Sequence, residues 1–279
     1  MAQIGKMNLL TVSKEVDFGV YLDGENLGEI LLPKKQVPEG VSIDDPVTVF
    51  IYHDSNDKLI ATTTKPHAFA GDFAMLKVID SNPVGTFFDW GLPKDLLMPY
   101  AEKRHRMEVG KTYLVRVFVD EESSRIAASA LLEEFLDETS SELEAGQEVK
   151  LIIERKTEMG FRAIINEECL GMLYDSEIFK TLTIGDRVTG FIKQIRDDGK
   201  IDLWLQKQSY KQIDPLSQKV LDYLQTHDGI MYITDKSSPE MIKKTFHVSK
   251  GTFKKAIGSL YKSRKVSIEG DHIKLSKES

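Results

Sequence analysis

Residues 18–22 read Phe-Gly-Val-Tyr-Leu, and their pattern returns twice further along the chain. The second copy is Val-Gly-Thr-Phe-Phe at 84–88, and the third is Met-Gly-Phe-Arg-Ala at 159–163. The first two glycines of these pentads are 66 residues apart and the last two are 75 apart. Gly110 and Gly185 are separated by 75 residues again. Matching offsets at two points indicate an internal repeat, which governs the whole fold.

The residues around each pentad follow one order. A short apolar strand comes next, then a polar excursion, a strand of alternating apolar residues, a charged turn and a last strand. Each unit therefore predicts about five strands of period-2 character. Closing such a sheet into a barrel removes its exposed edges, and the OB-fold is the small barrel that fits. We expect a mainly β, multidomain chain with three tandem five-stranded OB-fold barrels, at residues 1–66, 67–139 and 140–210.

The three units resemble the RNA-binding repeat of ribosomal protein S1. That repeat begins with an aromatic residue, a glycine, any residue, an aromatic and an aliphatic. The first unit keeps both aromatics, Phe18 and Tyr21, whereas the second keeps Phe87 and the third has Arg162 at the later position. The family's histidine on the following strand corresponds to Leu31, Leu97 and Tyr174. Its basic residue before the last strand corresponds to Lys58, Arg125 and Lys200.

An aromatic side chain exposed on a sheet gives a nucleobase a surface on which to stack. An arginine at such a position can stack as well. The alternative is that these aromatics are core residues, chosen for packing or β propensity. A basic run at 103–106 in the second unit is either a solvated loop or a phosphate contact. The RNA-binding residues predicted for the barrels are Phe18, Tyr21, Lys58, Phe87, Arg104, Arg106, Arg125, Arg162, Tyr174 and Lys200.

The charge distribution sets the C-terminal quarter apart. The whole chain has a net charge of −7, but residues 211–279 hold 13 Lys and Arg against 8 Asp and Glu. Residues 1–210 hold 24 against 36. This asymmetry indicates that the C-terminal segment meets a polyanion, while the barrels must rely on local patches and stacking.

Residues 211–279 predict an α+β winged helix-turn-helix domain. Apolar residues recur at helical spacing before Gly229, Ser238 is placed to cap a second helix, and Ser249 to cap a third at 250–264. A two-strand hairpin at 266–275 completes the domain. The third helix carries most of the lysines, and its start has no Asn, Gln or Arg for bidentate base reading. The nucleic-acid contacts predicted here are Lys250, Thr252, Lys254, Lys255, Lys262, Arg264 and Lys274, although winged helices also dock proteins.

Three S1-type barrels followed by a winged helix resemble the conserved virulence factor B family of bacterial RNA-binding regulators. The resemblance covers essentially the whole chain and is most specific in residues 235–240 and 249–262. It implies RNA binding linked to the control of gene expression, and it brings no catalytic residues.

Other classes of function find little support in the sequence. No phosphate-binding loop, dinucleotide fingerprint, zinc-protease motif or nucleophile elbow occurs, and the six histidines are scattered. We therefore expect no enzyme, no metal and no cofactor. A metal site at His53, Asp54 and Asp57 is disfavoured because these residues fall in a strand-to-turn stretch. Cys169, the single cysteine, is expected to be a buried, inert thiol. The short apolar runs and the start of the chain predict a cytoplasmic protein without a membrane span.

These observations favour an RNA-binding regulator that holds single strands with several modules. The alternative is a DNA-binding transcription regulator led by the winged helix, with the barrels as interaction modules. The acidic balance of residues 1–210 leaves a third reading, a protein-docking scaffold. The acidic stretch 133–148 is expected to be a solvated helical spacer.

Overall fold

The glycine of each pentad lies where its strand passes very close to the backbone of the following strand. In the computed structural model, a Cβ atom at Gly19, Gly85 or Gly160 would overlap a backbone carbonyl oxygen of the next strand. Each of these glycines is the first residue of the second strand of its sheet. Only glycine permits this approach, which is the physical reason for the repeat in the sequence. The structure describes residues 1–137, 142–206, 215–262 and 265–276.

The first repeat is a closed barrel with the strand order β1-β2-β3-β5-β4. All its pairs are antiparallel except β3 with β5, which is parallel. Its core is formed by inward-facing Leu22, Ile30 and Leu32 together with residues of β4. The strands are β1 (Met7–Val16), β2 (Gly19–Asp23), β3 (Glu29–Pro33), β4 (Pro46–His53) and β5 (Leu59–Thr62).

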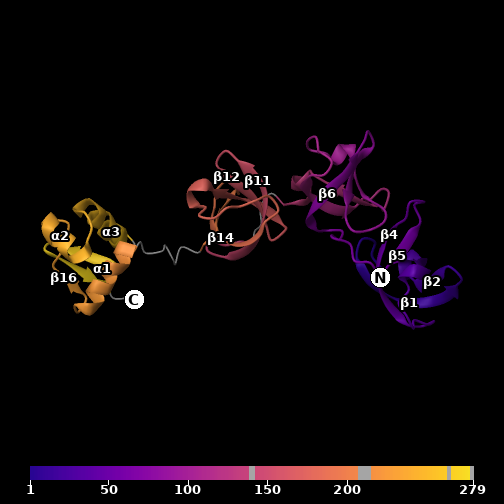
Figure 1. Cartoon of the computed structure of the whole chain (residues 1–279), viewed down its shortest axis with the longest axis horizontal. Coiled ribbons are helices and arrows are strands. Elements are labelled where there is room, and N and C mark those ends of the chain that lie inside the picture. The colour runs from indigo at the N-terminus through magenta and orange to yellow at the C-terminus, as the bar shows by residue number, and fades with distance from the viewer. Residues whose placement is uncertain (138–141, 207–214, 263–264, 277–279) are drawn as a thin grey trace. The chain divides into compact units, whose positions relative to one another are not determined.

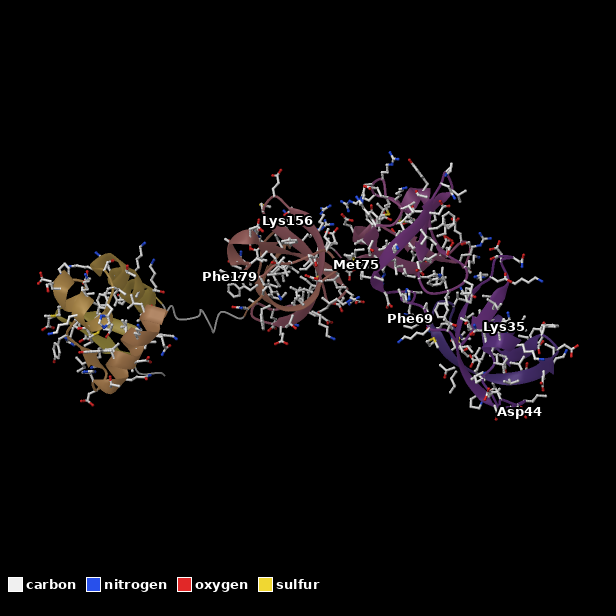
Figure 2. The ribbon with its side chains drawn as sticks, in the orientation of Figure 1. Lys35, Asp44, Phe69, Met75, Lys156 and Phe179 are labelled. Atoms are coloured by element: carbon white, nitrogen blue, oxygen red, sulfur yellow. The ribbon has the colours of Figure 1, made fainter. Side chains whose placement is uncertain are left out.

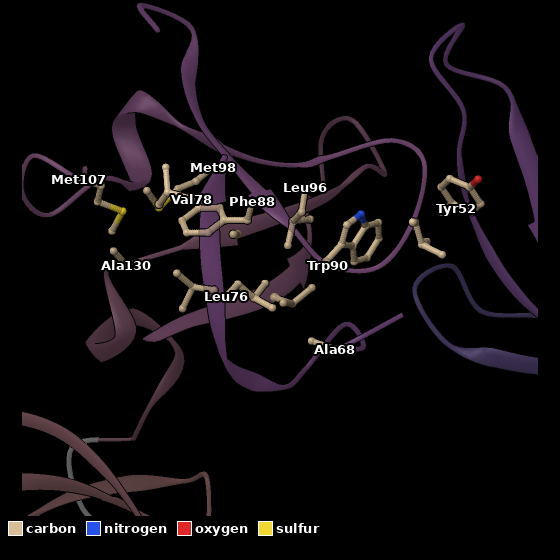
Figure 3. Close-up of a cluster of buried hydrophobic side chains, with 14 of the residues drawn as sticks. Tyr52, Ala68, Leu76, Val78, Phe88, Trp90, Leu96, Met98, Met107 and Ala130 are labelled. Atoms are coloured by element: carbon tan, nitrogen blue, oxygen red, sulfur yellow. The ribbon is translucent and has the colours of Figure 1, made fainter. Parts of the chain in front are cut away.

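The second repeat has the same strands in the same sequence but is only nearly closed. Its sheet order is β10-β9-β6-β7-β8, so β8 and β10 are its two edges. Its core joins the first barrel, because Phe50 and Tyr52 of β4 pack with Trp90. Figure 3 shows this buried cluster, with Trp90 and Tyr52 labelled. The ring centroids of Phe50 and Trp90 are 5.7 Å apart. The strands are β6 (Phe73–Ser81), β7 (Gly85–Asp89), β8 (Leu96–Pro99), β9 (Thr112–Val119) and β10 (Ile126–Ser129).

The third repeat is again a closed barrel, with the order β11-β12-β13-β15-β14. A buried apolar cluster that includes Phe73, Leu132 and Ile164 joins it to the second repeat. Cys169 is fully buried, as expected, and burial raises the pKa of its thiol to about 11, which favours the protonated form. The strands are β11 (Glu148–Thr157), β12 (Gly160–Ile165), β13 (Cys169–Tyr174), β14 (Arg187–Ile195) and β15 (Ile201–Trp204).

The polar excursion after the third strand begins in the same way in every repeat. A 3-10 turn follows directly, at Lys34–Gln36, Tyr100–Glu102 and Asp175–Glu177. Two further 3-10 turns lie at Glu25–Leu27 and Leu132–Phe135. The expected helical spacer at 133–148 is not found in the described part of this stretch, residues 133–137 and 142–148. Glu133 and Glu134 lie in the turn, next to buried Leu132, and β11 already begins at Glu148.

The C-terminal segment is a separate unit with its own core. The chain divides into two compact units, Met1–Leu205 and Gln206–Ser279 (Figure 1). Val220 and Leu224 of the first helix, Ile242 of the second and Phe253 of the third are fully buried in the second unit. Its elements are α1 (Pro215–Thr226), β16 (Ile230–Met231), α2 (Pro239–Phe246), α3 (Lys250–Lys262), β17 (Val266–Glu269) and β18 (His272–Leu275).

The predicted helix caps of this unit are confirmed. Met241 N–H donates to Ser238 Oγ at the start of α2, and Thr252 N–H donates to Ser249 Oγ at the start of α3. The wing is larger than predicted, because β16 pairs with β18 and makes a three-stranded sheet instead of a hairpin. With only two residues, β16 is too short to show a period. None of the helices in the described ranges is long and apolar enough to cross a membrane.

The observed architecture confirms the predicted fold class: three five-stranded barrels, closed or nearly closed, and a winged helix.

Candidate nucleic-acid interface

The first barrel presents its two aromatic residues to solvent. Phe18, just before β2, is 58% exposed, and Tyr21 on β2 is half-buried. Their rings meet edge to face with centroids 6.5 Å apart. Lys58 lies exposed in the turn between β4 and β5, where its backbone N–H donates to Asp54. The core of this barrel is filled by aliphatic side chains, so the aromatic pair is free to stack on a ligand.

Strand register relates the three outer faces to one another. Tyr21 pairs with Leu31, Phe87 with Leu97, and Arg162 with Met172. The residue equivalent to Leu31 and Leu97 is therefore Met172, and the prediction that Tyr174 holds this position was wrong by two residues. Tyr174 still lies on the same face of β13, because side chains alternate along a strand. Sequence alone could not fix this register, since the third repeat lacks the family's marker residues.

The second barrel places Phe87 and Arg125 on the walls of one cavity of about 530 Å³. The cavity lies beside the unpaired edges β8 and β10, and the β4–β5 turn of the first barrel contributes to its walls. Arg125 donates to Asp57 of that turn over 2.8 Å. Phe87 is half-buried and Arg125 is exposed. Phe87 and Arg125 were predicted as contacts of the second barrel alone, but the cavity that they line is shared by the first and second barrels.

Two other predicted arginines are held in a chain of ion pairs. Arg104 donates to both oxygens of Glu133, and Arg162 donates to Glu133 over 2.8 Å. Arg162 also forms two hydrogen bonds with Glu154, whose side chain is only 5% exposed. Burial raises the pKa of Glu133, but the hydrogen bonds from Arg104 and Arg162 outweigh it and lower the pKa from 4.5 to about 2. Arg162 therefore braces the junction of the second and third barrels, whereas Arg106 is exposed.

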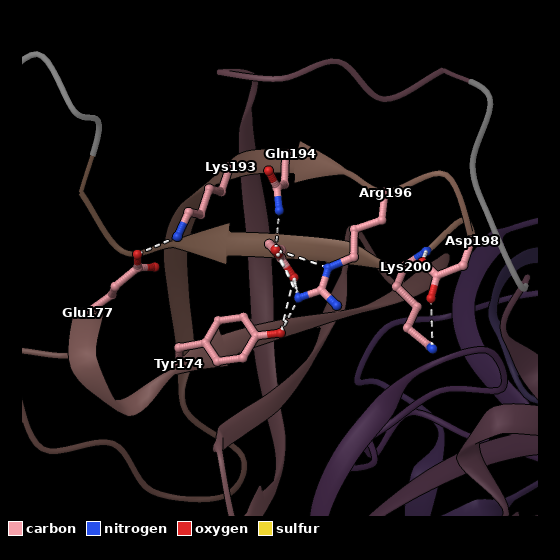
Figure 4. A network of polar contacts seen from close by, with 8 residues as sticks. Tyr174, Glu177, Lys193, Gln194, Arg196, Asp198 and Lys200 are labelled. Atoms are coloured by element: carbon pink, nitrogen blue, oxygen red, sulfur yellow. Dashed lines mark hydrogen bonds and ion pairs between the residues drawn. The ribbon is translucent and has the colours of Figure 1, made fainter.

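The third barrel carries a polar network around Tyr174 (Figure 4). Asp202 on β15 is buried and accepts hydrogen bonds from Gln194, Arg196 and the Tyr174 hydroxyl. Arg196 also donates to the Tyr174 hydroxyl, and its guanidinium lies 5.9 Å from the centre of that ring. Lys200 pairs with Asp198 in the turn before β15. The buried carboxylate thus holds a tyrosine and an arginine side by side at the surface.

Further cations and aromatic rings, which were not predicted from the sequence, lie on the same barrel. Lys193 lies over the Trp204 ring at 5.6 Å, and Lys156 over the Phe161 ring at 4.4 Å. Phe179, after the 3-10 turn, is 83% exposed and projects outward, as Lys156 does (Figure 2). Lys193 could have been found from the alternation along β14. The exposure of Trp204 could not be predicted from the alternation of residues, because Trp204 is the final residue of β15.

The winged helix presents its lysines along α3. Lys254, Lys255 and Lys262 are exposed on this helix, and Lys274 is exposed on β18. Lys254 approaches Asp235 only to 3.9 Å. Within the described ranges, no carboxylate lies within 4.0 Å of the ammonium groups of Lys255, Lys262 or Lys274.

The remaining predicted residues of this domain lie near the start of α3 or beyond its described end. Lys250 donates to Ser237 O over 2.9 Å, and the Thr252 hydroxyl bonds with Ser249. Lys250 thus ties the start of α3 to the segment just before α2, and Thr252 supports the cap of α3 itself. Arg264 lies outside the described residues.

Comparisons with known proteins agree with this architecture. A model of the S1 domain matches residues 4–64, and a model described as a CvfB-like winged helix domain matches residues 218–275. YitL, described as an uncharacterized protein of Bacillus subtilis, is 30% identical over 94% of this chain and 90% of its own length. Conserved virulence factor B of Staphylococcus epidermidis is 26% identical over 99% of this chain and 95% of its own length.

One solved structure is also similar over nearly its full length. It is described as a multidomain protein with nucleic acid binding domains from Streptococcus pneumoniae. It is 26% identical, covers 98% of each chain, and has a TM-score of 0.41. The two domain matches support a nucleic-acid-binding role, and neither of them describes an enzyme.

Proposed function

This chain belongs to the conserved virulence factor B family, and from that premise we propose that it is a gene-expression regulator that binds single-stranded RNA with several modules. The observation that carries the proposal is the aromatic pair of exposed Phe18 and half-buried Tyr21, which lies outside an aliphatic core. Stacking on aromatic side chains requires unstacked bases, which single strands offer and a duplex does not.

The surface of the third barrel supports the same role. The Tyr174 hydroxyl and the Arg196 guanidinium stand together on its outer face, joined by Asp202. Such a pair offers a ring for a base and a cation for a phosphate or ribose oxygen. We propose Phe18, Tyr21, Phe87, Tyr174 and Arg196 as the stacking and positioning contacts. Lys58, Arg106, Arg125 and Lys200 are proposed as contacts to the backbone.

The lysines of α3 supply the electrostatic part of the proposal. An ammonium group is a point charge that suits phosphates better than the planar edge of a base. Contacts with phosphates position a nucleic acid but read no sequence. We therefore propose that the winged helix contributes affinity through Lys254, Lys255, Lys262 and Lys274. Several weak modules on one chain then gain avidity from their effective concentration.

The test is a direct comparison of ligands with the full chain. Fluorescence anisotropy would measure the Kd for a labelled single-stranded RNA of about 20 nucleotides, the matching single-stranded DNA and the matching duplex DNA. We expect the RNA to bind tightest, with an affinity that falls as salt rises. Tighter binding of duplex DNA would favour a transcription regulator led by the winged helix. Absence of binding to all three would favour a protein-docking scaffold in the cytoplasm, and would overturn the proposal.

A further inference from the structure

One row of side chains recurs on the outer face of all three barrels. Strand register places it across the first, fourth and fifth strands of each barrel. Its members face outward, because their neighbours along each strand belong to the barrel cores. The rows are Met7, Phe50 and Thr62 in the first barrel, Phe73, Arg116 and Ser129 in the second, and Glu148, Phe191 and Trp204 in the third.

In the first two barrels the row lies against the next barrel. Phe50 and Thr62 are buried, and Phe50 packs with Trp90 of the second barrel. Phe73 and Ser129 are buried as well, and Phe73 belongs to the apolar cluster that joins the second barrel to the third. The row is therefore the surface on which each of these barrels contacts its successor. A nucleic acid cannot reach its buried side chains.

The third barrel is the last of the three, and its row differs in exposure. Phe191 and Trp204 are half-buried, and Glu148 is exposed. Lys193 lies 5.6 Å from the centre of the Trp204 ring and forms an ion pair with Glu177. Two aromatic rings thus reach the surface at the position that the first two barrels cover.

The charged groups around these rings favour a small flat ligand over another protein domain. A domain that covered Trp204 would also cover the ion pair of Lys193 with Glu177, and taking charges out of water costs free energy. The cores of protein interfaces are accordingly depleted of charged residues. A single base covers one ring and leaves these groups in water. Because Lys193 is already paired, the surface offers stacking and not a site for a phosphate.

The row continues the candidate interface of the third barrel. Asp202 lies two residues before Trp204 on β15, so the two side chains point to the same side of the sheet. Asp202 accepts hydrogen bonds from the Tyr174 hydroxyl and from Arg196 (Figure 4). The contacts already proposed on this barrel and the aromatic row therefore belong to one surface, along which a single strand can pass.

We propose that Trp204, with Phe191 beside it, stacks on a base of the bound RNA and extends the contact made by Tyr174 and Arg196. The inference rests on the proposed RNA binding. It adds a contact that the first two barrels cannot make, since the equivalent Phe50 and the rest of their rows lie against the next barrel.

Tryptophan fluorescence reads this contact directly, because the chain has two tryptophans and the other, Trp90, is buried. We expect a saturating single-stranded RNA to quench the emission of the full chain. Trp204→Phe keeps a ring for stacking, so it removes the quenching and changes the Kd from anisotropy by less than about twofold. Trp204→Ala weakens RNA binding at least about fivefold, for the loss of one stacked base. Ile184→Ala, an exposed apolar residue of the same barrel outside the row, is the control and leaves both readouts unchanged.

The outcomes separate this contact from the proposed function. Unchanged emission at an RNA concentration that saturates the anisotropy, or quenching that persists in Trp204→Phe, would overturn the contact and leave the proposed function intact. Emission that responds to protein concentration and not to RNA, together with a dimer in light scattering, would make the row an interface between two copies and would also overturn it. A chain that shows no RNA binding by anisotropy would overturn the proposed function, and the contact with it.

Discussion

The barrels and the winged helix both carry Lys and Arg side chains, but the two regions differ in whether these side chains pair with carboxylates. In the barrels, Arg104, Arg125, Arg162, Arg196 and Lys200 each pair with a carboxylate. On α3 of the winged helix, Lys255 and Lys262 have no such partner in the described part of the chain. A paired arginine has a fixed position and little free charge, whereas an unpaired lysine attracts any nearby phosphate. The difference suggests that the barrels contribute shape and stacking, and the winged helix contributes charge.

The largest effect is expected from removing the charge of α3. Substituting Lys254, Lys255 and Lys262 together by alanine should weaken single-stranded RNA binding on the order of a hundredfold at low salt. The slope of log affinity against log salt should fall by about 2, since each lost phosphate contact on a single strand contributes about 0.7. Anisotropy titrations over a range of salt would measure both. Lys219→Ala, an exposed lysine of α1, is the control and should leave the slope unchanged.

Removing the aromatics should have a smaller effect of a different kind. We expect Phe18→Ala with Tyr21→Ala to weaken RNA binding by about 1–2 kcal/mol in total, the lower part of the range for stacking of one base. This is less than the hundredfold loss, about 2.8 kcal/mol, expected for the three lysines. The salt slope should not change, because stacking releases no counterions. Leu9→Ala is the matched control, as Leu9 is an exposed apolar residue of the same barrel. A changed slope in the aromatic variant would contradict the division of roles.

The smallest predicted effect concerns the paired arginines. Glu133→Gln should lower the free energy of unfolding by about 1–2 kcal/mol near pH 7, allowing for its partial exposure. Because the pKa of Glu133 in the folded chain is about 2 instead of 4.5, its stabilisation is complete above about pH 5 and is lost as the pH falls towards 2. Denaturant unfolding at several pH values would show a weaker acid dependence in the variant. Glu134→Gln is the control and should behave like the wild type. Equal effects of the two substitutions on unfolding would contradict the stabilising role of the Glu133 ion pairs.

The fold could be predicted from the sequence because its glycines and helix caps are local features that agree with the final architecture. The recurring glycines mark positions where a side chain would strike a carbonyl oxygen, and Ser238 and Ser249 cap helices as their surroundings predicted. Each helix cap and each of these glycines is a local feature of the sequence. Their spacing can therefore be recognised even though the other residues of the three repeats differ. Strand register and the two-residue β16 depend on pairing partners far along the chain, and the sequence does not encode those by period.

The candidate nucleic-acid interface was less predictable than the fold, because it too depends on contacts between residues that are distant in the sequence. A lysine or arginine in the sequence does not reveal whether a carboxylate faces it, and Arg162 was assigned to stacking although Glu154 and Glu133 hold it. The cavity that Phe87 and Arg125 line is formed only where two barrels meet. Contacts between modules leave no periodic trace in either module.

The division of roles between the barrels and the winged helix can be tested by the salt dependence of single-stranded RNA binding, measured side by side for the wild type and the two multiple variants. We expect a steep slope for the wild type, a parallel line of lower affinity for the Phe18 and Tyr21 variant, and a slope smaller by about 2 for the variant of the three lysines. Parallel lines for all three proteins, or a wild-type affinity that does not respond to salt, would contradict it.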